Sequence, residues 1–132
     1  MIQPAKTIET SGAEHVARLV ELRLEKGLHT VVVEQLFSPQ NMKYWQNNNG
    51  IGAGPRLTRQ LNLAEFPWSA NEVEREINTI FATLNLPVEI DQQRQYMRVH
   101  VSPKLFAVHK MAIESVYATA SNAGIVTRPN ER

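Results

Sequence analysis

Apolar residues recur along this chain of 132 residues with two different spacings, and each spacing predicts a type of element. Positions three or four residues apart favour a helix, whereas strict alternation favours a strand with one buried face. Helical spacing predicts three helices, over residues 11–27, 69–84 and 102–124. The second helix has the clearest start, because Ser69 and Glu72 form an S-x-x-E capping box.

Four further segments predict strands. The stretch HTVVVEQLF at 29–37 is short and rich in β-branched residues, so it predicts a strand buried on both faces. Residues 56–63 alternate between leucines and polar side chains, which predicts a half-buried strand. PVEID at 87–91 and RQYMRVHV at 94–101 predict a hairpin around a polar turn. Between the first two strands, SPQNMKYW at 38–45 predicts one short helical turn that starts at a Ser-Pro pair.

The predicted order of elements is α-β-β-α-β-β-α. Strands that follow one another usually pair antiparallel, so we expect a single α+β domain with an antiparallel sheet of about four strands and helices packed on one face. The domain is predicted to span residues 11–124. Residues 1–10 are predicted to form a flexible N-terminal arm, and residues 125–132 a C-terminal tail.

One face of this sheet is predicted to be polar and to carry most of the candidate chemistry. If both predicted hairpins lie in one sheet, Arg56 shares an open face with Tyr96, Arg98 and His100. Arginine offers a planar fork that suits phosphate or carboxylate, and an aromatic ring can stack on a base. The alternative is an ordinary solvated face without a ligand, because half-exposed antiparallel sheets normally show polar residues to water.

Arg59 breaks the alternation, because its position falls among the leucines of the apolar side. A buried arginine needs an acidic or a carbonyl partner, for which Glu34 and Glu89 are candidates. Otherwise the strand has a bulge near Arg59, or the side chain reaches an edge of the sheet.

The glycine-rich stretch NNNGIGAGPRLTR at 47–59 is a second candidate site. It matches neither a dinucleotide fingerprint nor a P-loop, because a proline and a strand pattern follow where a helix should begin. Exposed backbone amides in such a turn can still hold an anion. Two interpretations remain, an anion-binding loop and a flexible connection between strands. The residues concerned are Asn49, Gly50, Gly52 and Gly54.

Charge is distributed in blocks although the formal net charge is only +1. Residues 1–34 sum to −1, residues 35–64 to +3, residues 65–91 to −5 and residues 92–132 to +4. Once folded, such blocks can form faces of opposite sign, which attract oppositely charged partners. The chain has no cysteine, which excludes disulfides and thiolate metal sites. No apolar run approaches a membrane span and nothing resembles an export signal, so we expect a cytoplasmic protein.

Catalysis and metal binding receive little support from the sequence. The four histidines, His15, His29, His100 and His109, lack the spacing of zinc ligands, and we expect no metal and no cofactor. His100 or His29 would be the acid or base if the protein were a small enzyme.

Association with another protein is the main alternative to ligand binding. Trp45, Trp68 and Tyr44 are large aromatic residues of the kind enriched at interface hot spots. The order of elements is similar to that of small dimeric secretion chaperones, which implies a homo-oligomeric assembly module, although the pI of about 8.1 is high for that class. The leading hypothesis is a non-catalytic binding protein whose basic strand face holds an anionic ligand, either a nucleotide or a nucleic acid.

Overall fold

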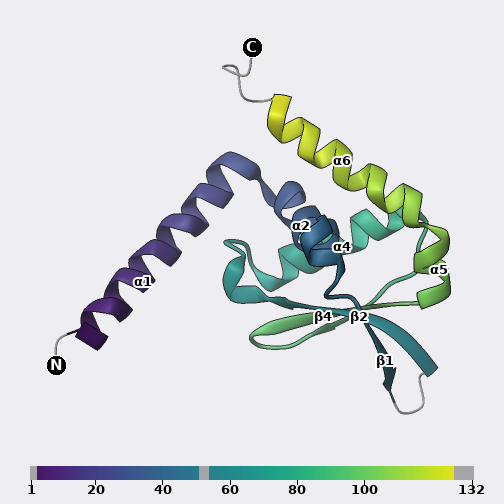
Figure 1. Ribbon diagram of the computed structural model, residues 1–132, viewed down its shortest axis with the longest axis horizontal. Coiled ribbons are helices and arrows are strands. Elements are labelled where there is room, and N and C mark those ends of the chain that lie inside the picture. Colours follow the sequence, from purple (N-terminus) through teal and green to yellow (C-terminus); the bar gives the residue numbers. More distant parts are fainter. Residues whose placement is uncertain (1–2, 51–53, 127–132) are drawn as a thin grey trace.

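The computed structural model describes residues 3–50 and 54–126, and these form one four-stranded antiparallel sheet with helices above one of its faces (Figure 1). The predicted α+β class is therefore confirmed. The strand order is β1-β2-β4-β3. The strands are β1 (Gln46–Gly50), β2 (Gly54–Asn62), β3 (Glu89–Gln92) and β4 (Tyr96–Val101). The helices are α1 (Gln3–Glu21), α2 (Leu28–Phe37), α3 (Pro39–Met42), α4 (Ala70–Leu84), α5 (Pro103–Val108) and α6 (Lys110–Val126), with a π-helical turn η1 (Leu22–Lys26) and a 3-10 turn η2 (Leu63–Glu65).

The strand predicted at 29–37 is wrong, because these residues form helix α2. Val31, Val32 and Val33 are all buried, although consecutive residues of a helix point in different directions. Helix α2 is therefore covered over most of its circumference, with only His29 of residues 29–37 exposed, and apolar side chains are favourable on the covered sides. A short, uniformly apolar segment has no periodicity that separates a buried strand from a buried helix, and tertiary packing outweighs the strand preference of valine.

The first strand of the sheet is instead β1, within the polar stretch that the sequence marked as a loop. It pairs antiparallel with β2, with Gln46 opposite Thr58 and Gly50 opposite Gly54. Asparagine and glycine have low strand propensity, so β1 depends on its hydrogen bonds to β2 rather than on its own preference. Gly54 has φ of 71°, a conformation that glycine adopts without strain.

Several local predictions are confirmed. The turn α3 follows Ser38, and Ser69 and Glu72 form the reciprocal capping box at the start of α4. The predicted hairpin is β3 paired antiparallel with β4.

Two helix ends differ from the prediction. Helix α1 begins at Gln3 and runs through Ser11, so Ser11 is not its N-cap. Pro4 in the first turn suits a helix start, because proline lacks the amide hydrogen that has no helical partner there. Helix α6 continues past Gly124 to Val126, and a break at His109 separates it from α5. Residues 127–132 of the predicted tail lie outside the described residues.

The hydrophobic core lies between the sheet and the helices above it. Its most buried large side chains come from α2, α4, α6 and the inner faces of β2 and β4: Leu36, Phe81, Ile77, Ile113, Leu61, Met97 and Val99. As predicted, the odd-numbered residues of β4 face this core.

Trp45 belongs to the same core, which corrects its predicted place at an interface. Its side chain is 7% exposed, and its ring stacks with Phe37 at 6.3 Å and contacts Phe106 at 4.9 Å between centroids. Its indole Nε1 donates to the carbonyl of Leu36 at 2.7 Å. The ring therefore contributes to folding and is not available to a partner.

The carboxyl end of α2 is closed by side chains from outside the helix. The last carbonyl groups of a helix have no partner within it, and cations are favourable there because of the helix dipole. Three side chains satisfy the carbonyls of residues 34–36. Asn41 Nδ2 donates to Glu34 O at 2.9 Å, Arg59 donates to Gln35 O at 3.0 and 3.2 Å, and Trp45 Nε1 donates to Leu36 O.

Candidate functional site

The polar side chains that were predicted to share one face of the sheet do share it. Between β2 and β4, Thr58 lies opposite His100, and Gln60 lies opposite Arg98. In Figure 1 the helices lie on the other side of the sheet. The open face therefore carries these residues from β2 and β4, together with Arg56, Asn62 and Tyr96.

Each arginine of this face has an acidic neighbour from the edge strand β3. Arg56 Nη1 lies 3.1 Å from Glu89 Oε1, and Arg98 Nη1 lies 3.9 Å from Asp91 Oδ2. The two arginines and the two acidic residues thus form two pairs of opposite charge on this face. Their charges cancel, so the face offers local cationic groups rather than a continuous positive surface.

His100 is held neutral within this network. It is only 5% exposed, and its Nδ1 lies 2.8 Å from the hydroxyl of Thr58. Burial lowers the pKa of His100 most strongly, and the positive charge of Arg56 lowers it further, against the opposing effect of Glu89 and Asp91. His100 therefore connects β2 and β4 as an uncharged side chain.

We expect His100 to make the protein less stable at acidic pH. Unfolded, the imidazole takes up a proton as the pH falls through its ordinary pKa of 6.5, whereas the folded protein holds it neutral to lower pH. Stability then falls from pH 6.5 down to the lowered pKa, because the unfolded state binds more protons in that window. The variant His100→Asn, which keeps a polar group near Thr58, should lose less stability over the same range.

Urea unfolding of both proteins at several values between about pH 7.5 and about pH 5 measures this difference. The other three histidines are present in both proteins and form a common background. Parallel pH profiles would show that His100 does not titrate differently in the two states.

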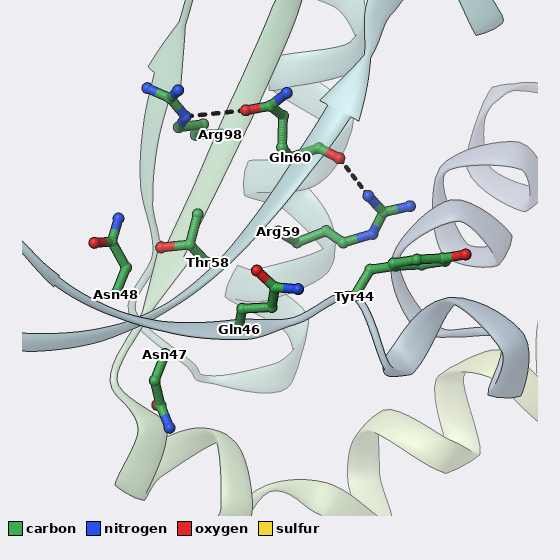
Figure 2. Close-up of a pocket in the computed structure, with 8 residues that line it drawn as sticks. All are labelled: Tyr44, Gln46, Asn47, Asn48, Thr58, Arg59, Gln60 and Arg98. Atoms are coloured by element: carbon green, nitrogen blue, oxygen red, sulfur yellow. Dashed lines mark hydrogen bonds between the residues drawn. The ribbon is translucent and has the colours of Figure 1, made fainter.

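A pocket of about 430 Å³ opens beside this face, where β1 separates from β2 (Figure 2). The paired part of β1 ends at Gln46, opposite Thr58, and the chain before it turns into the core at Trp45. The edge of β2 beyond Thr58 is therefore not covered by β1. Eight residues line the pocket: Tyr44, Gln46, Asn47, Asn48, Thr58, Arg59, Gln60 and Arg98.

Arg98 forms one wall of the pocket. Its Nε donates to Gln60 Oε1 at 3.1 Å, and its guanidinium carbon lies 4.7 Å from the centroid of the Tyr96 ring. These contacts hold the side chain across the strands. The terminal nitrogens of Arg98 carry further hydrogen-bond donors. Among the described residues, the acidic group near them is that of Asp91, 3.9 Å from Nη1.

Arg59 forms the opposite wall of the pocket. Its contacts show which groups pair with an arginine on the apolar side of the strand. Its guanidinium donates to the carbonyl oxygens of Gln35 and Gln60, so its partners are carbonyls and neither Glu34 nor Glu89. The register of β2 with β4 is continuous at Arg59, which excludes a bulge there. Burial lowers the pKa of Arg59, and Glu65 and Tyr44 oppose that shift. The side chain remains cationic and lies over the ring of Tyr44.

The remaining lining is rich in amide groups. Figure 2 shows Gln46 and Asn48 of β1 on the same side as Thr58, and Asn47 pointing the other way. Side-chain amides both donate and accept hydrogen bonds. Within the described residues, no carboxylate lines the pocket. The pocket thus combines two cations with neutral donors and acceptors.

The sequence drew attention to only part of this pocket. Arg98 was a candidate ligand residue and Tyr44 a candidate interface residue, and the two line the same pocket. Gln46 and Asn48 were missed because a polar run of weak strand formers resembles a loop. The signal for these residues in the sequence was the run of four consecutive amide side chains at 46–49.

The other predicted site residues lie elsewhere. Arg56, Tyr96 and His100 are on the open face without lining the pocket, and Trp68 is half-buried beside Arg23. Asn49, Gly50 and Gly54 form the ends of the β1–β2 hairpin, and Gly52 lies in 51–53, outside the described residues. Anion binding by the glycine loop therefore stays a prediction.

Over the ranges 3–50 and 54–126, no three histidine, aspartate or glutamate side chains gather as a metal site requires. Among the helices described, none has both the length and the apolar character needed to cross a membrane. Comparison with models of protein families, with curated proteins and with solved structures found no match.

Proposed function

We propose that this protein is a non-catalytic binding protein and that the pocket between Arg59 and Arg98 holds a small anionic ligand of the size of a nucleotide. The observation that carries the proposal is the composition of the pocket, in which two guanidinium groups and several amides meet without a carboxylate among the described lining residues. Its volume of about 430 Å³ lies within the range of small-molecule sites.

The two ends of the pocket suit different parts of such a ligand. The terminal nitrogens of Arg98, one of which lies 3.9 Å from Asp91 Oδ2, can donate to a phosphate or carboxylate in the bidentate manner that arginine favours. The amides of Gln46 and Asn48 can hydrogen bond to a polar group such as a base or a sugar. Tyr44, which is half-exposed, adds an aromatic surface at the rim.

A small ligand is favoured over a long nucleic-acid strand by the charges outside the pocket. A strand of nucleic acid requires several cations along its path, because each phosphate must be neutralised. On the open face, Arg56 is paired with Glu89, and Asp91 lies beside Arg98. Beyond the pocket, the described part of the open face therefore has no unpaired arginine that could bind further phosphates of a nucleic-acid strand.

Calorimetric titration with adenosine monophosphate, inorganic phosphate, citrate and a short single-stranded DNA tests the proposal. We expect at least one small anion to bind and Arg98→Gln to weaken it by about tenfold or more, since a charge-assisted hydrogen bond contributes about 1.5 to 3 kcal/mol. The matched control is Arg94→Gln, which removes the same charge from the exposed β3–β4 turn and should leave the affinity unchanged.

Failure of every small anion to bind, or equal losses in the two variants, would contradict the proposal. Binding of the DNA alone, with a steep dependence on salt, would instead support a nucleic-acid strand as the ligand.

A further inference from the structure

Exposed apolar side chains gather at two places outside the pocket. Six large apolar residues are prominently exposed in the described parts of the chain, and one of them, Tyr44, belongs to the pocket. The other five fall on α1 and on the elbow where α5 meets α6: Val16, Val20, Leu105, Val108 and Met111.

Helix α1 presents its apolar side to water. Val16 and Val20 are 59% and 50% exposed and lie one turn apart, with Ala13 and Ala17 exposed beside them. We call these four residues the arm face. An amphipathic helix normally buries such a face, and a single helix of this length is marginal in water without packing.

The opposite side of α1 is the one that approaches the rest of the molecule. His15, Arg18, Leu19 and Leu22 line a crevice of about 240 Å³ together with Gln35 of α2 and Glu65 of η2. The arm face thus points away from the protein's own core. A surface outside this molecule is needed to cover it.

The elbow is a compact apolar projection with positive charges beside it. The chain leaves helical geometry at His109, with φ of −91° and ψ of 13°. Val108 and Met111, on either side of this break, are 70% and 82% exposed, and Leu105 is also exposed. We call these three residues the elbow patch. Lys104 and Lys110 lie next to it in the sequence, and both are exposed. Lys110 Nζ also lies 3.9 Å from Glu114 Oε2, an exposed ion pair that a contact with a second copy would have to exchange.

We propose that the arm face of one copy packs on the elbow patch of a second copy of this chain, and that the contact is reciprocal in a twofold dimer. Charge complementarity supports this choice of partner. Glu14 and Glu21 are seven residues apart, so they lie along one side of α1 beside the arm face, where they can meet Lys104 and Lys110. Both glutamates are exposed, and Arg18 Nη1 lies 3.9 Å from Glu21 Oε1.

The two surfaces cannot satisfy each other within one molecule. Figure 1 shows α1 and α5 at opposite ends of the fold, so the arm does not reach its own elbow. A stable interface buries roughly 800 Å² of surface on each partner. One contact between the arm face and the elbow patch involves only a few helical turns and covers part of that area. A twofold arrangement makes the same contact twice, which doubles the apolar area that is buried.

Light scattering over a wide range of protein concentration tests the dimer. The wild-type protein should reach twice the chain mass of 15.0 kDa. Val16→Glu with Val20→Glu should halve that mass, and so should Val108→Glu with Met111→Glu. All four positions are exposed, so both variants should keep the wild-type circular dichroism. The control Ala82→Glu, at an exposed position on α4, should stay dimeric.

Mixing the two monomeric variants distinguishes this contact from a pairing of two α1 helices. One intact arm and one intact elbow remain in the mixture, so a heterodimer should form at high concentration. The charge exchange provides a further test. Glu14→Lys with Glu21→Lys should weaken the dimer, and so should Lys104→Glu with Lys110→Glu, whereas all four substitutions in one chain should restore it. A monomeric wild-type protein, or an elbow variant that stays dimeric, would overturn the proposal. Arg98→Gln should not change the mass.

Discussion

Trp45→Ala is expected to lower the free energy of unfolding by about 3 to 5 kcal/mol, the usual cost of truncating a buried tryptophan. The substitution removes a ring that packs between Phe37 and Phe106, and it also removes the donor to the carbonyl of Leu36. The free energy of unfolding of a domain is commonly about 5 to 15 kcal/mol, so this substitution would remove a large fraction of it. Urea unfolding followed by circular dichroism measures the loss.

Two comparisons separate the contributions of the ring. Trp45→Phe keeps an aromatic side chain but leaves the carbonyl of Leu36 without its donor, so its loss should be smaller than that of alanine. Trp68→Ala removes the other tryptophan, which is only half-buried, and should cost clearly less than Trp45→Ala. Equal losses for the two alanine variants would contradict the placement of Trp45 in the core.

Arg59→Leu is expected to destabilise the protein by about 2 to 4 kcal/mol, because it leaves part-buried carbonyl groups without donors and removes a cation from a helix carboxyl end. The carbonyls belong to Gln35, in the last turn of α2, and to Gln60. Arg59→Lys keeps the charge but loses the planar fork, so its loss should be intermediate. Thermal and urea unfolding of the three proteins provide the comparison.

Arg56→Leu is the matched control, since it makes the same change on the same strand. The carboxylate of its partner Glu89 is largely exposed, and exposed ion pairs contribute about 0 to 1 kcal/mol. If Arg59→Leu were no more destabilising than Arg56→Leu, the role of Arg59 at the end of α2 would be wrong.

Local signals predicted those parts of the fold in which sequence and environment agree. The capping box of Ser69 and Glu72 defined the start of α4, and the alternation of residues 96–101 defined the two faces of β4. Helix α2 could not be predicted in this way, because three consecutive buried valines, Val31 to Val33, obscure the helical periodicity on which such an assignment depends. Strand β1 was missed because its own residues have low strand propensity. Its conformation depends on pairing with β2.

The candidate site was predictable to the extent that it depends on register along neighbouring strands. Alternation placed Arg98 on the open face that β2 also contributes to, and the observed register brings it opposite Gln60. The acidic partners from β3 and the pocket lining from β1 depend on which strands are adjacent, and strand order is not encoded in local patterns. Arg59 was recognised as unusual, but its partner is a backbone carbonyl, which no residue type reveals.

The position of Trp45 ties the pocket to the hydrophobic core. The residues on either side of it, Tyr44 and Gln46, both line the pocket, while Trp45 itself is anchored beneath α2. The shape of the pocket therefore depends on packing in the interior. Substitutions at 44 and 46 can alter the lining while the core stays intact, whereas repacking around the indole would change the pocket and the stability of the fold together.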